Sequence, residues 1–97
     1  METQVRIYRI RPGELDAFVE EWQNQIVPLR RRFGFEIVAA WASEPENTFI
    51  WVVSHDGDFA AADREYYLSP ERAALEPDPA RHIEEPRTLA ARPVPLP

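Results

Sequence analysis

Arg6 and Tyr8, which stand two residues apart in the segment VRIYRI, are the side chains best suited to chemistry in this chain. Alternate residues of a strand project from the same face, so this guanidinium and this phenol lie opposite Val5 and Ile7. If the more apolar pair packs on helices, Arg6 and Tyr8 face the other side of the sheet. Beside an apolar cavity, such a pair binds a carboxylate or an enolate. The alternative pairs Arg6 with a glutamate of a second copy and makes Tyr8 a core residue.

Four further aromatic residues are candidates for the wall of such a cavity. Trp41 and Trp51 fall on opposite faces of a predicted hairpin, so only one of them shares the cavity. Tyr66 and Tyr67 are neighbours on a predicted helix and point about 100° apart, so one packs inward while the other faces solvent or a pocket. Core packing is the alternative role for all four, and no residue is identified as catalytic.

The two histidines offer weaker chemistry. His55 precedes Asp56, which could orient it as a general base, although the sequence His-Asp-Gly is also an ordinary turn. His82 lies in the charged segment DPARHIEEP, which predicts a surface loop. Their spacing gives no metal signature, and no cofactor is expected. Haem ligation by either histidine remains an alternative.

Two segments that contain tryptophan, residues 35–42 (FEIVAAWA) and residues 48–53 (TFIWVV), predict a β-hairpin around the turn at residues 43–47. A hairpin with one solvated face alternates apolar and polar residues, whereas this one is apolar on both faces. With Ser43 opposite Thr48, each face carries its own set of apolar side chains. One face holds Val38, Ala40, Ala42, Phe49, Trp51 and Val53, and the other holds Ile37, Ala39, Trp41, Ile50 and Val52. The predicted helices cover only one face, so the other packs on a partner or closes over a ligand.

A strand and a long helix are predicted before the hairpin. Residues 5–10 are β-branched and aromatic, which predicts the strand. Apolar residues at helical spacing predict a helix over residues 14–32. This stripe consists of Leu15, Phe18, Val19, Trp22, Ile26, Leu29 and Phe33. Pro28 lies within the helix and lacks an N–H, which predicts a kink or a broken last turn. Gly34 is expected to end the helix.

Two capping signals predict helices after the hairpin. Asp58 precedes residues 59–68, and Ser69 with a following proline begins a short helix over residues 71–75. Residues 87–94 predict a weak edge strand. The order strand-helix-strand-strand-helix-strand is typical of the α+β ferredoxin-like fold, an antiparallel sheet with helices on one face.

The length of 97 residues supports a single domain over residues 1–97, with a core over about residues 4–92 and a proline-rich tail at residues 93–97. The net charge of −6 argues against a nucleic-acid partner. No apolar run approaches the ~20 residues of a membrane span, and cysteine is absent, which together fit a cytoplasmic protein. The cluster at residues 30–32 (RRR) falls in the last turn of the long helix, and we interpret it as a helix end rather than a binding patch.

The segments VRIYRIRPG, VPLRRRFGF, VAAW, FIWVVSHDG and AAADREYYLSPE together resemble the NIPSNAP domain. The resemblance covers most of the chain and implies a dimeric α/β barrel, in which two ferredoxin-like subunits pack sheet face to sheet face. Each subunit then encloses a cavity between its sheet and helices or at the barrel interior. The wider superfamily includes cofactor-independent monooxygenases, muconolactone-type isomerases and haem-using enzymes.

Three functions are therefore expected. The first is binding of a small organic ligand, anionic or aromatic, in the barrel cavity, with the protein acting as a cofactor-independent oxygenase, isomerase or lyase. The second is a non-catalytic dimeric module for ligand binding or interaction, and the third is haem binding. The hairpin that is apolar on both faces independently predicts a homodimer through the sheet faces.

Overall fold

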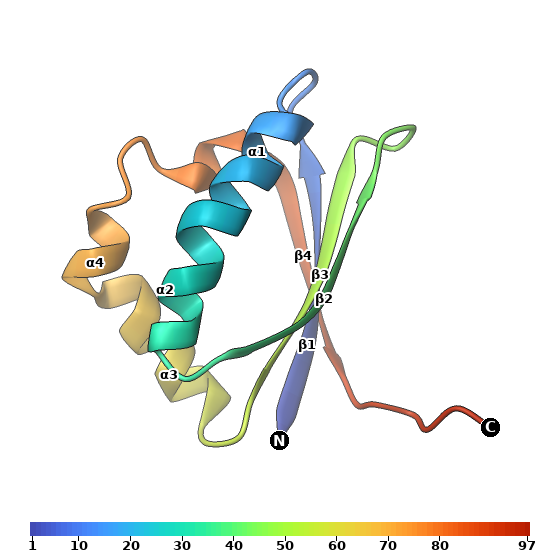
Figure 1. Cartoon of the computed structure of the whole chain (residues 1–97), viewed down its shortest axis with the longest axis vertical. Helices are drawn as coiled ribbons and strands as arrows, with labels where there is room; N and C mark the ends of the chain where they lie inside the picture. The colour runs from blue at the N-terminus through green and yellow to red at the C-terminus, as the bar shows by residue number, and fades with distance from the viewer.

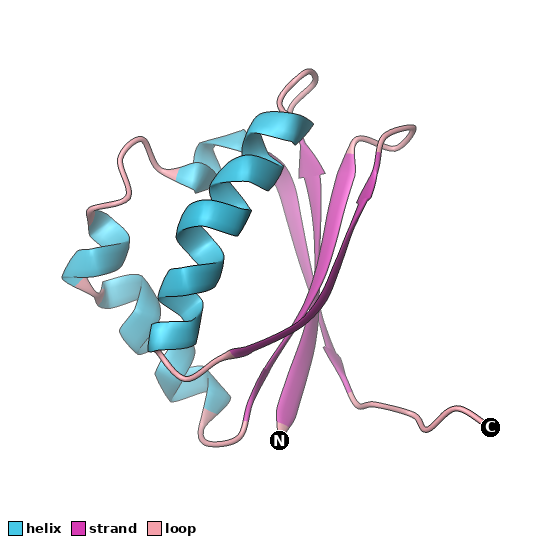
Figure 2. Ribbon diagram, viewed as in Figure 1, coloured by secondary structure: helices cyan, strands magenta, loops and turns pink.

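The computed structural model describes all 97 residues. It contains a four-stranded antiparallel sheet in the order β2-β3-β1-β4, with every helix on one face (Figure 1, Figure 2). The strands are β1 (Glu2–Ile10), β2 (Glu36–Ser43), β3 (Thr48–His55) and β4 (Ile83–Ala91). The predicted α+β ferredoxin-like fold is therefore confirmed. None of the helices combines the length and the hydrophobicity that a membrane span requires.

The first long helix is continuous but changes its winding in the middle. It comprises α1 (Leu15–Glu21), the π-helical turn η1 (Trp22–Ile26) and α2 (Val27–Arg32). At the junction the Val27 N–H bonds to the Trp22 carbonyl, five residues back. Pro28 has no N–H to donate, and the wider turn just before it accommodates this loss without ending the helix. Of the kink or broken last turn expected at Pro28, the broken turn is absent, because α2 continues past the proline, and the irregularity is a π turn just before it. Gly34 follows the helix with φ of 85°, as its place after the last turn predicts.

The second set of helices begins with α3 (Phe59–Leu68). It continues in two short pieces, α4 (Pro70–Ala73) and the 3₁₀ turn η2 (Pro79–His82). Both predicted caps are present. The Asp58 carboxylate accepts from the Ala61 N–H at 3.0 Å, and the Ser69 hydroxyl accepts from the Arg72 N–H at 3.0 Å. These caps satisfy N–H groups that the first helical turns leave free.

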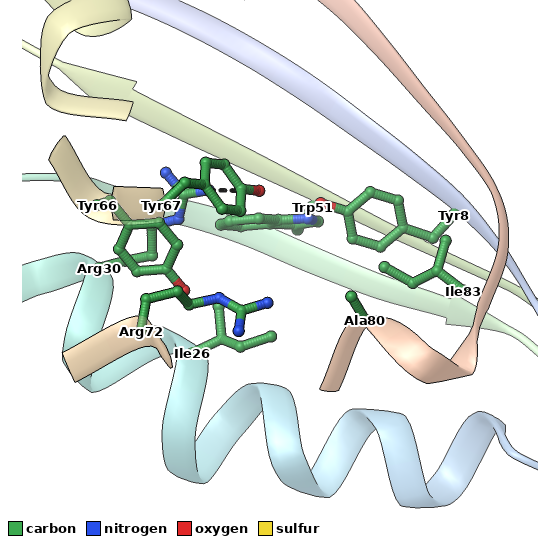
Figure 3. Close-up of a pocket in the computed structure, with 9 residues that line it drawn as sticks. All are labelled: Tyr8, Ile26, Arg30, Trp51, Tyr66, Tyr67, Arg72, Ala80 and Ile83. Carbon is green, nitrogen blue, oxygen red and sulfur yellow. Dashed lines mark hydrogen bonds between the residues drawn. The ribbon is translucent and has the colours of Figure 1, made fainter. Parts of the chain in front are cut away.

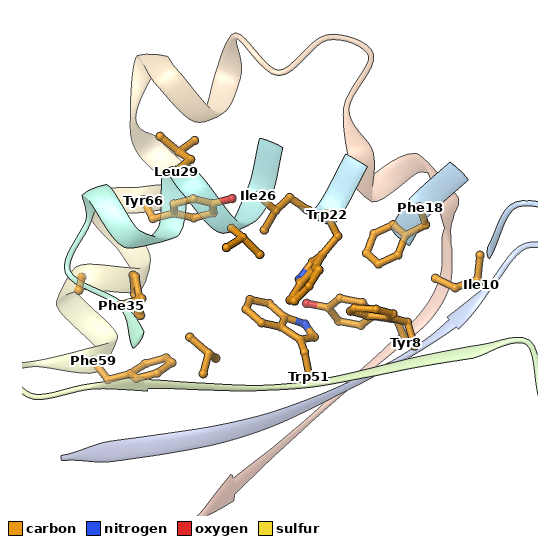
Figure 4. Packing of buried hydrophobic residues seen from close by; sticks show 14 of the residues in the cluster. Tyr8, Ile10, Phe18, Trp22, Ile26, Leu29, Phe35, Trp51, Phe59 and Tyr66 are labelled. Atoms are coloured by element: carbon orange, nitrogen blue, oxygen red, sulfur yellow. The ribbon is translucent and has the colours of Figure 1, made fainter. Parts of the chain in front are cut away.

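The core lies between the sheet and the helices (Figure 4). Phe18 is fully buried, and its ring meets the rings of Tyr8 and Phe49 edge to face. Trp22 contacts Trp51 in the same manner, with ring centres 5.7 Å apart. Of the predicted stripe, Leu15, Phe18, Trp22, Ile26 and Leu29 are buried, and Val19 and Phe33 are partly buried. The helix therefore packs on the sheet along the predicted face.

The hairpin has the predicted register at its turn, because Ser43 pairs with Thr48. A bulge between Ile37 and Ala39 then shifts the start of β2 by one residue. Ile37 consequently packs against the core, and Val38 lies on the open face, the reverse of the predicted assignment. Trp41 lies on the open face and is 58% exposed.

The central strand β1 also presents the opposite face from the one expected. Arg6 and Tyr8 are buried on the side that the helices cover, whereas Val5 and Ile7 are half-buried on the open side. The more apolar pair therefore does not pack on the helices. The helical layer supplies polar partners for Arg6, including Tyr67 and Asp63 of α3, which allow a guanidinium to be buried there.

Candidate functional site

A small cavity of about 50 Å³ lies between the sheet and the helices α3 and α4. Elements from the whole chain line it, from β1 and β3 through α2 and α3 to the start of β4 (Figure 3). Its lining consists of Tyr8, Ile26, Arg30, Trp51, Tyr66, Tyr67, Arg72, Ala80 and Ile83. One water needs roughly 10–15 Å³ on the same measure, so the cavity has room for a few waters or a small chemical group.

Four of the aromatic candidates from the sequence line this cavity. Tyr8 and Trp51 come from the sheet, and Tyr66 and Tyr67 both come from α3. Tyr66 is fully buried, while Tyr67 is 49% exposed at the outer side. Arg6 adjoins the cavity, and its guanidinium carbon lies 5.8 Å from the centre of the Trp51 ring. The structure therefore brings together most of the candidates, on the helix side of the sheet.

Trp41 and His55 lie away from this cavity. Trp41 is on the open sheet face, with the sheet between it and the helices. His55 stacks its ring edge to face with Phe35, and its Nδ1 accepts from the Gly57 N–H at 2.9 Å. Its expected partner Asp56 is exposed and makes no hydrogen bond to it. The His-Asp pairing is thus replaced by a local turn.

Arg30 is the central charged group of the site and is only 1% exposed. Its Nη1 donates to the Asp63 carboxylate at 2.6 Å. Its Nη2 donates to the Tyr67 hydroxyl at 3.1 Å (Figure 3). The guanidinium carbon lies 3.9 Å from the centre of the Tyr66 ring and 4.8 Å from that of Phe35. Aromatic faces and one carboxylate thus compensate for burying this cation.

Arg6 joins the same network from the sheet. It donates to Tyr67 at 3.2 Å and to Asp63 at 3.3 Å, so one carboxylate and one hydroxyl each serve two arginines. It also donates to the Gln4 side chain at 2.9 Å. The alternative pairing of Arg6 with a glutamate of a second copy is thus replaced by a pairing within the chain.

Arg72 enters the site from α4 and is 9% exposed. Its Nη2 donates to the Asp78 carboxylate at 2.8 Å. Burial lowers the pKa of Arg72, but this bond and the neighbouring hydroxyls outweigh the effect and raise it. The side chain therefore stays charged at the wall of the cavity.

Two phenols of the site, Tyr8 and Tyr66, are held neutral by burial. Burial raises the pKa of the Tyr8 and Tyr66 hydroxyls above the ordinary value, against the opposing influence of the nearby arginines. For Arg6, burial lowers the pKa, but Tyr8, Tyr67 and Asp63 together outweigh it. The arrangement therefore presents hydroxyl donors beside permanent cations at neutral pH.

Three N–H donors of the lining have no acceptor. They are Nε of Arg30, Nε of Arg72 and Nε1 of Trp51, and all are shielded from solvent. The Trp51 nitrogen points toward the Tyr8 hydroxyl, near enough to offset part of the burial-driven rise in the pKa of that hydroxyl but outside good hydrogen-bond geometry (Figure 3). Buried polar groups in folded proteins nearly always have a partner, so an accumulation of unpaired donors around one cavity is unusual.

His82 is buried rather than part of a surface loop. Its Nδ1 lies 2.7 Å from a Glu14 oxygen and its Nε2 lies 3.0 Å from a Glu21 oxygen. Arg81 reaches the same Glu21 carboxylate with two hydrogen bonds of 2.9 and 2.8 Å. These contacts, called the His82 clasp below, join His82 and Arg81 to Glu14 and Glu21 and so hold η2 against the first long helix. Haem ligation by His82 would have to break one of these two contacts.

The two arginines of the cavity were missed by sequence reasoning. Arg30 was interpreted as a helix end, yet it stands four residues after Ile26 and eight after Trp22, on the line of the buried stripe. That spacing is a signal that could have identified it. Arg72 has no comparable signal, because its helix has only four residues and its burial depends on the loop that brings Asp78 to it.

Comparisons with solved structures show the same fold. A NIPSNAP domain protein from Burkholderia xenovorans is similar with a TM-score of 0.82 at 19% identity, covering 97% of this chain and 95% of that one. A NIPSNAP family protein from Agrobacterium tumefaciens gives 0.84 at 16% identity, covering 96% and 92%. A putative antibiotic biosynthesis monooxygenase from Nitrosomonas europaea gives 0.70 at 10% identity, covering 97% and 99%.

The comparison with curated proteins gives no match. The NIPSNAP family model matches residues 2–95, nearly the whole chain. It agrees with the resemblance that the opening strand, the first helix end, the hairpin and the second helix carry in the sequence. The chain therefore belongs to the NIPSNAP family.

Proposed function

We propose that this protein binds a small organic ligand in the cavity between its sheet and α3–α4. The observation that carries the proposal is the lining itself, in which four aromatic residues lie beside the buried Nε–H donors of Arg30 and Arg72, which no protein group accepts. Apolar and aromatic walls with a few placed polar groups are the usual composition of a small-molecule site. A ligand that accepts those hydrogen bonds would remove the cost of leaving the donors unpaired.

A second hollow of about 320 Å³ adjoins the cavity and gives the ligand the room that the cavity alone lacks. The two share Tyr67, Arg72 and Ala80, which therefore stand between them. The remaining lining of this outer hollow comes from Ala73, Leu75, Glu76 and Asp78. A ligand that fills both spaces places one end deep in the site and the other beside α4.

The protein is further proposed to act as a homodimer through its open sheet face. Val38, Trp41 and Leu89 of that face are 54%, 58% and 40% exposed. A hollow of about 230 Å³ on the same face, lined in part by Val5 and Val52, would be enclosed by a second copy. Contiguous apolar surface of this kind is typical of an interaction site.

Catalysis in the same cavity is the second candidate, as a cofactor-independent oxygenase, isomerase or lyase. The supporting observation is the Tyr67 hydroxyl, which accepts from both Arg6 and Arg30 and keeps its own proton free to donate. A donor held beside two cations suits an oxygen on which negative charge develops. The reaction would use the ligand's own reactivity, steered by the arginines and phenols.

The three tryptophans provide a direct test of the binding site. In ¹⁵N-labelled protein each gives one indole N–H resonance, which the substitutions W22F, W41F and W51F assign. We expect small aromatic or aliphatic compounds at millimolar concentration to shift the Trp51 resonance and to leave that of Trp41 unchanged. The substitution A80F, which places a large ring where the cavity and the outer hollow adjoin, should abolish these shifts. A60F, at an exposed position of α3, is the matched control.

A screen in which no compound moves the Trp51 resonance would refute ligand binding at this site. Compounds that shift only Trp41 would place binding on the sheet face instead. For each compound that binds, incubation in air with chromatography of the mixture, and with an oxygen electrode, separates a binder from an enzyme. Conversion that Y67F abolishes while binding persists would support catalysis.

A further inference from the structure

The unpaired groups around the cavity are all of one chemical kind. The chain has four buried side-chain atoms without a hydrogen-bond partner, and all four are N–H donors. Three belong to the cavity lining, and the fourth is the indole of Trp22, whose ring contacts that of Trp51. No buried side-chain acceptor is left unpaired. A ligand in this site must therefore supply hydrogen-bond acceptors.

The distribution of charge points the same way. The guanidiniums of Arg6, Arg30 and Arg72 are buried, with side chains 7%, 1% and 11% exposed. Their carboxylate partners lie farther out, because the Asp63 and Asp78 side chains are 24% and 56% exposed. Among these paired groups three cations face two carboxylates, so the inner end, away from Glu76 of the outer hollow, has one positive charge in excess. An excess charge in a poorly solvated site favours a ligand of opposite sign.

The outer hollow limits how much negative charge the ligand carries. Glu76 and Asp78 stand at this end, so a second anionic group placed here would meet carboxylates rather than cations. Ala73, Leu75 and Ala80 offer apolar contact for the body of the ligand in the same place. The cavity itself is only large enough for a compact head group.

We infer that the ligand is an organic monoanion, a carboxylate or an enolate with an apolar body. Its charged oxygens accept hydrogen bonds from the free Nε–H groups of Arg30 and Arg72, and its body lies in the outer hollow beside α4. This inference rests on the proposed function and adds the chemical class that the site selects. It distinguishes such acids from amines, from neutral alcohols and from inorganic phosphate, which has no apolar body to contact Ala73, Leu75 and Ala80 in the outer hollow.

Three probes with the same phenylpropyl skeleton and similar size test the sign of the ligand charge on the unmodified protein. They are 3-phenylpropionate, 3-phenylpropan-1-ol and 3-phenylpropylamine, titrated at pH 7 with the Trp51 indole resonance as readout. We expect the acid to bind roughly tenfold or more tightly than the alcohol, because it accepts charge-assisted hydrogen bonds. The amine and inorganic phosphate should bind more weakly than the acid.

Two substitutions then test whether Arg72 is the residue that produces the preference for the acid over the alcohol. Arg72→Gln removes the charge and should bring the affinity for the acid down to that for the alcohol, while the alcohol changes less than about threefold. Arg64→Gln, at an exposed position of α3, should leave all three affinities unchanged. If Arg72→Gln does not fold, Arg72→Lys keeps a cation for Asp78 but lacks Nε–H, and it should still lose part of the preference.

The outcomes separate this inference from the proposed function. If the alcohol or the amine shifts Trp51 at the same concentrations as the acid, the site binds ligands without selecting an anion, and only the inference fails. The same holds if Arg72→Gln weakens all three probes equally. If phosphate binds best, the ligand class is wrong. If neither these probes nor any screened compound moves Trp51, the inference and the proposed function fail together.

Discussion

Arg30 of α2 and Asp63 of α3 form an ion pair with 2.6 Å between Nη1 and Oδ1, and this pair joins the first long helix to α3 on the helical side of the sheet. The same carboxylate oxygen also lies 3.3 Å from Nη2 of Arg6 on β1. Asp63 is thus the one carboxylate that holds both buried arginines on this side of the cavity. Its negative charge makes their burial tolerable.

We expect Asp63→Asn to destabilise the protein by about 3 kcal/mol, because it leaves two buried guanidiniums without their counter-ion. This is the low end of the range for a broken buried pair, since the Asp63 side chain is 24% exposed. Urea unfolding followed by circular dichroism measures the change. Glu65→Gln, on an exposed face of the same helix, should alter stability by less than about 0.5 kcal/mol. Equal effects of the two substitutions would contradict a special role for Asp63.

Shortening the most buried side chain of the first long helix, Phe18, tests the core. Phe18→Ala should cost roughly 3–5 kcal/mol, because Phe18 is fully buried and packs on two other rings. Trp22→Ala is expected to fall in the same range. Both losses approach the whole stability of a domain of this size. A loss below about 1 kcal/mol in urea unfolding would be inconsistent with the packing described.

The open sheet face should hold two copies together. We expect sedimentation to show a dimer at micromolar concentration, with an interface that buries about 1,000 Å² or more. Trp41→Glu should convert it to a monomer, because a carboxylate in an apolar interface has no partner. Leu68→Glu provides the control, since Leu68 is 77% exposed at the end of α3, away from the sheet. A wild-type protein that sediments as a monomer at this concentration would refute the dimeric barrel arrangement.

The His82 clasp predicts a loss of stability in acid. The hydrogen bonds from Arg81 chiefly lower the pKa of the Glu21 carboxyl, with a further contribution from His82. A carboxyl whose pKa is lower in the folded state stabilises the fold above its unfolded pKa of about 4.3, and this contribution disappears as the pH falls through the folded value. Urea midpoints between pH 3 and pH 7 should therefore decline less steeply in Glu21→Gln than in the wild type. The exposed neighbour substitution Glu20→Gln should keep the wild-type slope; if it flattens the curve equally, Glu21 is not the group responsible.

The sequence determined most elements of this protein because the signals for them are local, although β4 begins at Ile83, four residues before the predicted strand at residues 87–94. The apolar spacing from Leu15 to Leu29 defined the buried face of the first helix, and Asp58 and Ser69 marked the starts of α3 and α4. Ser43 and Thr48 set the hairpin register. Capping, turns and helical periodicity act over a few residues, so they can be recognised without knowledge of the rest of the chain.

Tertiary structure decided which way the side chains face and therefore where the site lies. The bulge at Val38 exchanges the faces of neighbouring residues in β2, and the side of the sheet that the helices cover reverses the expected role of Arg6. Arg30 and His82 became buried because carboxylates distant in sequence, on α3 and on α1, reach them. A charged side chain enters a core only where a partner meets it, and that meeting depends on how the elements pack rather than on neighbours in the sequence.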